Sequence, residues 1–177
     1  MEALSVAPPP PLPTSTPLPT PGELVRGLGG FAWLGLAGTL GAGQASFVAA
    51  PFALVTAAGV LLLTVPALVV GHQYLRLGAA PPAIVGEIAR VFARCGDVAL
   101  ATVPALLLFS MTSRLGGGIA ALLLAALGLL GLRLAARRLV RLELDAAGHP
   151  VPMGLLVLAW SGLAALVGLR LTLHYLL

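Results

Sequence analysis

Long apolar runs dominate the pattern of this chain. A helix needs about 20 mostly apolar residues to cross a hydrocarbon layer of about 30 Å, because each residue adds about 1.5 Å. Residues 27–71 contain no Asp, Glu, Lys, Arg or His, and the small and polar residues at 41–46 are typical of a turn. With the runs that follow, the pattern predicts five transmembrane helices, at about residues 27–43, 48–71, 96–113, 115–132 and 151–170.

The first of these segments, residues 27–43, is rich in glycine. In water each glycine costs a helix roughly 1 kcal/mol relative to Ala, but lipid reduces that difference because unsatisfied backbone groups cost more there. Gly35, Gly38 and Gly41 also offer a small face for close helix packing. We therefore predict a span here, and the alternative is a re-entrant or interfacial segment, which would leave four spans.

Between the second and third spans, polar and apolar positions separate onto two faces. After Pro81 and Pro82, which suit a helix start, apolar residues recur at three- and four-residue spacing. They are Ile84, Val85, Ile88, Val91, Phe92 and Val98. We predict an amphipathic helix at about residues 82–95 that lies in the membrane interface, either as a docking surface or lever or as a plain connector.

The charged face of this segment allows two ion pairs. Glu87 and Arg90 are three residues apart, as are Arg94 and Asp97, which places each pair on one side of a helix. Asp97 is the deepest acid that this pattern predicts. Because ionisable groups inside lipid are functional candidates, two interpretations stay open for Asp97: interfacial pairing with Arg94, or an ion-binding group.

The composition agrees with a membrane protein. Of the 177 residues, 59 % are hydrophobic and 9 % are charged, and the mean hydropathy is +1.04. Soluble domains carry about a quarter charged residues. We therefore predict an all-α, polytopic transmembrane helical bundle whose immediate partner is the lipid bilayer, and we expect no nucleic-acid partner.

The N-terminal segment differs from the rest of the chain. Eight prolines lie between Pro8 and Pro21, and no basic start followed by an apolar core marks a secretory signal. Residues 1–22 are therefore predicted to form a disordered, polyproline-like tail before a transmembrane domain at 23–177. PxxP spacing in the tail allows docking on an aromatic groove, and a plain spacer is the alternative.

The arginines predict an orientation, because Lys and Arg near short loops favour the cytoplasmic side. All ten basic residues are Arg, and five spans with a cytoplasmic N terminus place eight of them inside. These are Arg26, Arg76, Arg90, Arg94, Arg133, Arg137, Arg138 and Arg141. The C terminus is then external. Abundant Ala, Leu, Gly, Pro and Arg without Lys favours a bacterial inner membrane.

A second basic cluster, Arg133 to Arg141, is predicted to continue the fourth helix beyond the membrane. Arg133, Arg137 and Arg141 fall on one stripe at four-residue spacing, and Arg137 and Arg138 are expected to face anionic headgroups. A topogenic stop signal also explains the cluster.

Side chains that carry chemistry are sparse. Cys95 has no intrachain partner, and His72, His149 and His174 lie in three different segments without a second ligand at helical spacing. We predict no catalytic, cofactor-binding or metal site, and hence no enzyme. The predicted function is a scaffold, adaptor or assembly subunit that contacts other membrane proteins or forms a homo-oligomer. The alternative is a small transporter or channel component with Asp97 as its ion-binding group.

One amphipathic segment and several glycine and proline positions resemble those of a known protein family. The amphipathic Glu87-to-Arg94 segment, Pro104 within a span, Gly116-Gly117-Gly118 and Gly128-x-x-Gly131 together resemble bacterial members of the Yip family, small five-span membrane proteins. The likeness covers about residues 48–140, and such glycines and prolines are frequent in membrane spans. Eukaryotic Yip proteins act as membrane adaptors in vesicle traffic. The resemblance therefore implies a five-span layout and an adaptor role, and no reaction or functional residue.

Overall fold

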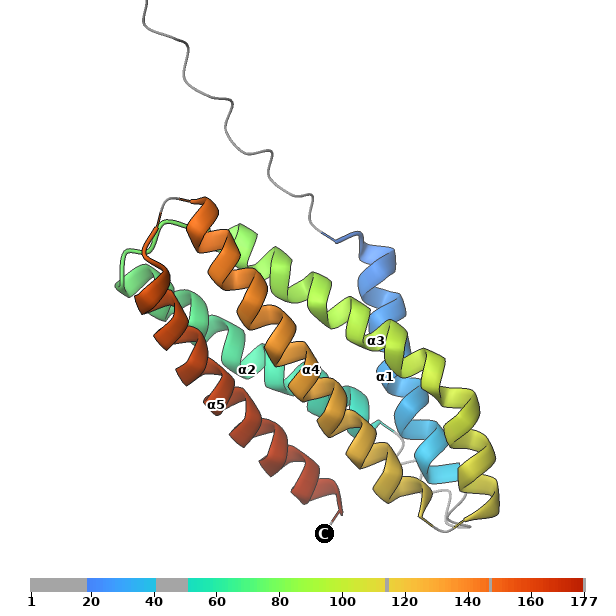
Figure 1. Ribbon diagram of the computed structural model, residues 1–177. Coiled ribbons are helices and arrows are strands. Elements are labelled where there is room, and N and C mark those ends of the chain that lie inside the picture. The colour runs from blue at the N-terminus through green and yellow to red at the C-terminus, as the bar shows by residue number, and fades with distance from the viewer. Residues whose placement is uncertain (1–18, 41–50, 114, 147, 177) are drawn as a thin grey trace, which may run out of the picture.

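The computed structural model describes residues 19–40, 51–113, 115–146 and 148–176, with the backbone alone for 175 and 176. These residues form five α-helices in an elongated bundle (Figure 1). The helices are α1 (Pro21–Leu40), α2 (Phe52–Tyr74), α3 (Pro81–Thr112), α4 (Gly116–Asp145) and α5 (Pro150–Leu176). The predicted all-α class is confirmed. The predicted turn at 41–46 and most of the predicted tail lie outside the described residues.

Four of these helices, α2 to α5, are long and apolar enough to cross a membrane. Their outward leucines, such as Leu62, Leu122 and Leu158, are 71 to 77 % exposed, a surface that suits lipid and not water. The protein is therefore a multi-pass integral membrane protein. The glycine-rich α1 is not among the four. By length and composition, the described helices therefore agree with the alternative prediction of four spans.

The start of α1 is fixed by a capping box. The Glu23 N–H donates to Thr20 Oγ1 at 3.3 Å, and the Thr20 N–H donates to Glu23 Oε2 at 2.7 Å. These two bonds satisfy backbone donors that a helix start leaves unpaired. The helix therefore begins at Pro21 rather than at residue 27, and the last two residues of the predicted tail are helical.

α1 runs parallel to α3 and approaches it closely. Gly30 lies against the backbone of Gly96 in α3, so that a Cβ on Gly30 would overlap the Gly96 carbonyl. Further along, the Ser110 hydroxyl donates to the Ala37 carbonyl at 2.8 Å. Gly38, from the predicted small face, packs against α4. The glycines that weaken α1 as an isolated helix thus allow it to pack within the bundle.

α3 is one continuous helix of 32 residues. This corrects the prediction of an interfacial helix at 82–95 followed by a separate span at 96–113. Half of the apolar face that suggested a lipid contact is buried in the protein instead, since Ile84, Ile88 and Val91 are at most 4 % exposed, whereas Val85 and Val98 remain exposed. No proline falls at the expected junction, so nothing interrupts the backbone hydrogen bonds there.

The other helices also extend beyond their predicted ends. α2 ends at Tyr74 rather than at 71, and α5 runs past residue 170 to Leu176. α4 continues through the basic cluster to Asp145, as expected for a helix that leaves the membrane at that end. α5 begins at Pro150, whose fixed backbone angle suits the first helical position.

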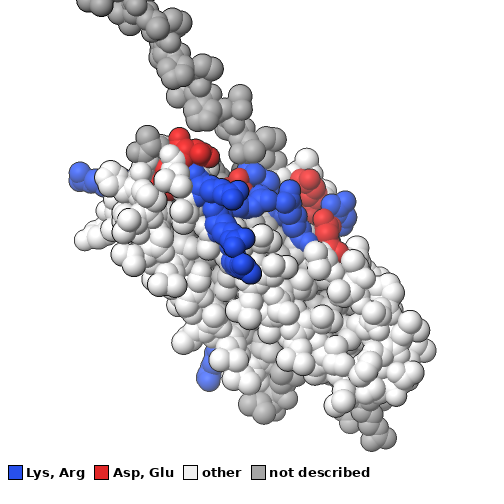
Figure 2. Space-filling model, in the orientation of Figure 1, with Lys and Arg blue, Asp and Glu red and all other residues white. Residues whose placement is uncertain are grey.

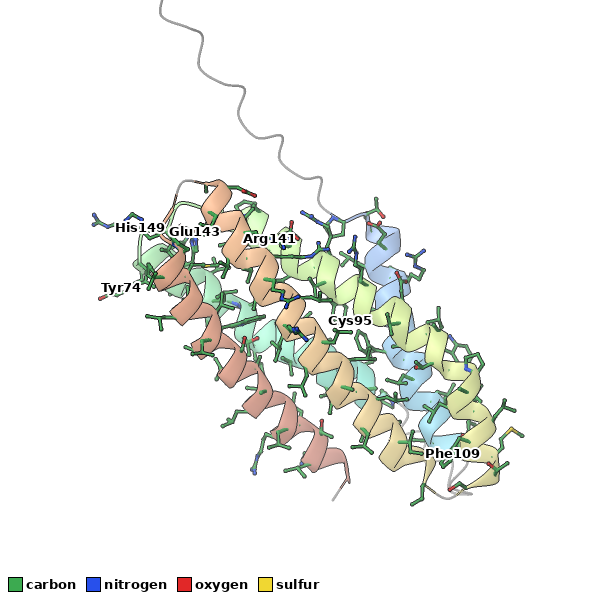
Figure 3. The ribbon with its side chains drawn as sticks, in the orientation of Figure 1. Tyr74, Cys95, Phe109, Arg141, Glu143 and His149 are labelled. Carbon is green, nitrogen blue, oxygen red and sulfur yellow. The ribbon has the colours of Figure 1, made fainter. Side chains whose placement is uncertain are left out.

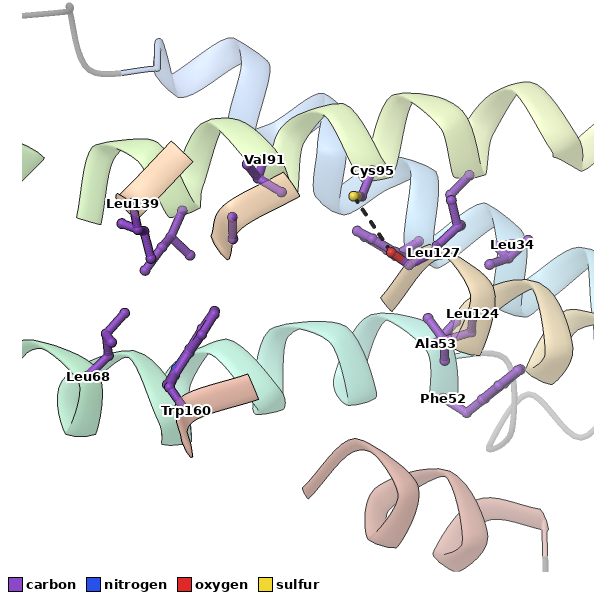
Figure 4. Close-up of a cluster of buried hydrophobic side chains, with 14 of the residues drawn as sticks. Leu34, Phe52, Ala53, Leu68, Val91, Cys95, Leu124, Leu127, Leu139 and Trp160 are labelled. Atoms are coloured by element: carbon purple, nitrogen blue, oxygen red, sulfur yellow. Dashed lines mark hydrogen bonds between the residues drawn. The ribbon is translucent and has the colours of Figure 1, made fainter. Parts of the chain in front are cut away.

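One hydrophobic core joins all five helices (Figure 4). Its fully buried members include Leu34, Leu68, Ile84, Leu139 and Met153. Trp160 of α5 belongs to this core, and its indole N–H donates to the Thr64 carbonyl of α2 at 3.1 Å. The bond satisfies the polar group that a buried tryptophan brings with it.

Candidate functional site

Charged side chains gather at one end of the bundle, where α2 and α4 end and α3 and α5 begin (Figure 2). They form a band across the upper part of that view, above a surface that is almost entirely uncharged. We call this the arginine-rich end. It carries Arg76, Arg90, Arg133, Arg137, Arg138 and Arg141, together with Glu87, Glu143 and Asp145.

The most buried polar contact at this end joins α2 to α4. His72 Nε2 lies 3.2 Å from Glu143 Oε2, and the two side chains are 2 % and 0 % exposed. Glu143 lies at the arginine-rich end together with Tyr74 and His149 (Figure 3). A carboxylate removed from water in this way needs several hydrogen-bond donors to offset its desolvation.

Glu143 also holds the loop that joins α2 to α3. Its Oε1 accepts the Gly78 N–H at 2.6 Å, and its Oε2 accepts the Ala79 N–H at 3.1 Å. Gly148, just before α5, lies so close that a Cβ there would overlap Oε1. One carboxylate therefore ties together four helix ends, and its oxygens are occupied by protein donors.

Glu143 is not among the residues that the sequence singles out, and it replaces Asp97 as the most buried acid of the described chain. The helical spacing of α4 could have indicated that Glu143 is buried. Ala135, Leu139 and Glu143 follow one another at four-residue intervals and are 3 %, 0 % and 0 % exposed. The partner could not be predicted in this way, because His72 is 71 positions earlier in the chain.

The predicted pair of Glu87 and Arg90 is confirmed, and a second arginine joins it. Arg90 Nη1 lies 2.7 Å from Glu87 Oε1, and Arg138 Nη1 of α4 lies 3.1 Å from Oε2. Glu87 is only 9 % exposed, so this side of α3 faces α4 rather than the membrane surface. Arg138, expected to face lipid headgroups, thus joins two helices.

Asp97 pairs with Arg26 of α1 and not with Arg94. Arg26 donates from Nε to Oδ1 at 2.6 Å and from Nη2 to Oδ2 at 2.9 Å. The predicted partner was wrong because Arg26 becomes a neighbour only when α1 packs along α3. The two side chains are 59 % and 38 % exposed, so the pair lies on the flank of the bundle rather than inside it.

A groove separates α4 from α5 near the arginine-rich end. It has a volume of about 450 Å³, and its walls include Arg137 and Arg141 of α4 and Gly154, Val157 and Ser161 of α5. Both arginines are exposed, and neither belongs to an ion pair within the described chain.

Further along the same two helices the bundle contains an apolar cavity of about 330 Å³. Leu124, Trp160 and Ala164 are among its walls. Cys95 also lines it, and its Sγ lies 3.9 Å from the Leu127 carbonyl oxygen (Figure 4). Thr56 Oγ1 is buried at this cavity without a hydrogen-bond partner among the described residues.

The remaining candidates lie apart from one another. Cys95 is buried near the middle of the bundle, whereas His149 is exposed at the arginine-rich end (Figure 3). His174 belongs to the last turn of α5. Within the described ranges, no group of three His, Cys, Asp or Glu residues could hold a metal ion.

Comparison of the chain with protein-family models, with curated proteins and with solved structures finds no match. The resemblance to the Yip family stays a prediction. Function has to be inferred from the arrangement of the residues described above.

Proposed function

We propose that the protein is a non-enzymatic scaffold or adaptor of a bacterial inner membrane, where it contacts other membrane proteins or further copies of itself. The observation that carries this proposal is that three pairs of ionisable side chains each join one helix to another. The joined pairs are Arg26 with Asp97, Arg138 with Glu87 and His72 with Glu143. Cross-links of this kind favour one fixed arrangement over the moving parts that transport requires.

The distribution of charge also favours a scaffold. Long described stretches along α1 to α4 contain no Asp, Glu, Lys, Arg or His. These stretches are 28–40, 52–71, 98–113 and 115–132. Proton and ion carriers place such groups within their spans. Transport with Asp97 as the ion-binding group would first require its carboxylate to release Arg26.

The orientation belongs to the same proposal. We place the arginine-rich end and the N terminus in the cytoplasm and the C terminus outside, because arginines concentrate on the cytoplasmic side of short loops. The adaptor role implied by the Yip resemblance is in line with this arrangement.

Two measurements test the proposal. Purification from native membranes in mild detergent should recover the protein in a complex of defined stoichiometry, and liposomes that contain it should pass no proton or cation current above empty vesicles. A strictly monomeric protein without a partner would contradict the scaffold. A current that Asp97→Asn abolishes, and that the control Arg94→Ala on the same helix leaves intact, would replace the scaffold with a transporter.

A further inference from the structure

The groove between α4 and α5, and the apolar cavity that these two helices line together with α1, α2 and α3, have the chemistry of the two parts of a phospholipid. We propose that this seam binds one anionic glycerophospholipid, with its phosphate beside Arg137 and Arg141 and one acyl chain in the apolar cavity. The site goes beyond the scaffold role and does not depend on it.

The groove has the charge that the headgroup needs. Arg137 and Arg141 are one helical turn apart on α4 and both line the groove. Glu87 forms ion pairs with the nearby Arg90 and Arg138, whereas the two groove arginines pair with no acid of the described chain. Guanidinium groups bind phosphate oxygens through paired hydrogen bonds, and basic pockets between membrane helices are typical of anionic headgroup binding.

The cavity has the length of an acyl chain. The α4 residues that line it extend from Leu124 to Ala135, about 16 Å of helix at 1.5 Å per residue. Half of a bilayer's hydrocarbon core is about 15 Å. The cavity volume of about 330 Å³ lies at the lower end of the range of ligand pockets, about 300 to 1,000 Å³.

The cavity is open to the bilayer from the side. Leu129 of α4 and Leu169 of α5 both line it, and they are 66 % and 61 % exposed. Beyond Ala164, no described side chain of α5 is buried, so this helix leaves α4 uncovered towards its C-terminal end. An acyl chain can enter laterally from the leaflet without crossing a polar barrier.

The groove and the cavity follow one another along both helices. Ala136 lines the groove and Ala135 the cavity, while Ser161 lines the groove and Trp160 the cavity. In the proposed complex, one ligand with a charged head and an apolar tail occupies both.

A helix from a second copy of the protein fits less well than an acyl chain. A helix about 10 Å across and about 16 Å long occupies on the order of 1,200 Å³, several times the cavity volume of about 330 Å³. The Arg137 and Arg141 pair also favours an anion, and a second copy would bring its own excess of arginine.

The headgroup is tested by titrating the delipidated, detergent-purified protein with phosphatidylglycerol or with phosphatidylcholine of the same acyl chains, followed by native mass spectrometry. We expect one saturably bound phosphatidylglycerol. The double variant Arg137→Ala/Arg141→Ala should weaken its binding on the order of tenfold and leave phosphatidylcholine binding unchanged. The control Arg94→Ala/Arg133→Ala removes the same charge outside the groove and should bind phosphatidylglycerol as the wild type does.

Variants that fill the cavity test whether an acyl chain occupies it. Gly128 lines the cavity, and a Cβ there meets no atom, so Gly128→Leu is chosen to place a side chain in the space. It should weaken binding of both phospholipids, whereas Gly162→Leu, an equally open position of α5 outside the cavity, should not. Ala165→Leu provides a second filling variant if Gly128→Leu fails to fold, as judged by circular dichroism.

Four results would overturn the proposal. They are the absence of saturable phosphatidylglycerol binding, equal weakening by the two double-arginine variants, equal binding of glycerol phosphate without acyl chains, and a dimer that phosphatidylglycerol dissociates.

Discussion

His72 and Glu143 are 71 positions apart in the chain, yet their side chains lie 3.2 Å apart at no more than 2 % exposure. The carboxylate also accepts the N–H groups of Gly78 and Ala79. Removal of Glu143 would leave the buried His72 side chain and the N–H groups of Gly78 and Ala79 without this partner. The ends of four helices therefore depend on this one side chain.

We expect Glu143→Ala to lower the free energy of unfolding by about 3 kcal/mol, the lower end of the cost of removing one partner from a buried pair. SDS-induced unfolding in mixed micelles measures the change. Asp145→Ala is the matched control, because Asp145 lies on the same last turn of α4 and is exposed. Equal stability of the two variants would show that the buried contacts of Glu143 do not hold the helix ends.

The contact between α1 and α3 predicts opposite effects for two adjacent glycines. A methyl group on Gly30 would overlap the Gly96 carbonyl, so Gly30→Ala should destabilise the protein by about 1 to 3 kcal/mol, as overpacking does. A Cβ on Gly29 meets no atom, so Gly29→Ala should be neutral or stabilising by up to about 1 kcal/mol. Thermal unfolding in detergent compares the two, and destabilisation by both would contradict the close approach.

The partner of Asp97 is testable by double-mutant cycles. Asp97→Asn and Arg26→Gln should each have a small effect on stability, because both groups are partly exposed. The two substitutions should be coupled, since each removes the same two hydrogen bonds. Asp97→Asn and Arg94→Ala should be additive. Coupling to Arg94 without coupling to Arg26 would restore the local pair predicted from the sequence.

The topology predicts on which side of the membrane a fused reporter lies. Fusions after Ala79 and after Ala146 follow the arginine-rich ends of α2 and α4 and should report a cytoplasmic position. Fusions after Ser113 and at the C terminus should report an external position. An alkaline phosphatase and green fluorescent protein pair gives complementary signals on the two sides, and a cytoplasmic C terminus would contradict the orientation inferred from the arginines.

The sequence alone determined the class of this protein and the approximate places of its apolar spans, but not that α3 is one continuous helix. Apolar runs such as those of α2 and α4 leave little choice, because a backbone in lipid must satisfy its hydrogen bonds within the helix. The concentration of charge at one end is likewise visible without a structure. Local pairs follow too, as Glu87 and Arg90 show, because three-residue spacing in a helix brings side chains together by itself.

Only the tertiary structure decided which distant residues meet. The free energy of burying a group depends on what surrounds it, and the neighbours of Asp97 and Glu143 are residues far away in the chain, Arg26 and His72. For the same reason the apolar face of α3 could be predicted, but not whether lipid or protein covers it. The seam between α4 and α5 likewise appears only when the two helices lie side by side, since its groove and cavity belong to neither helix alone.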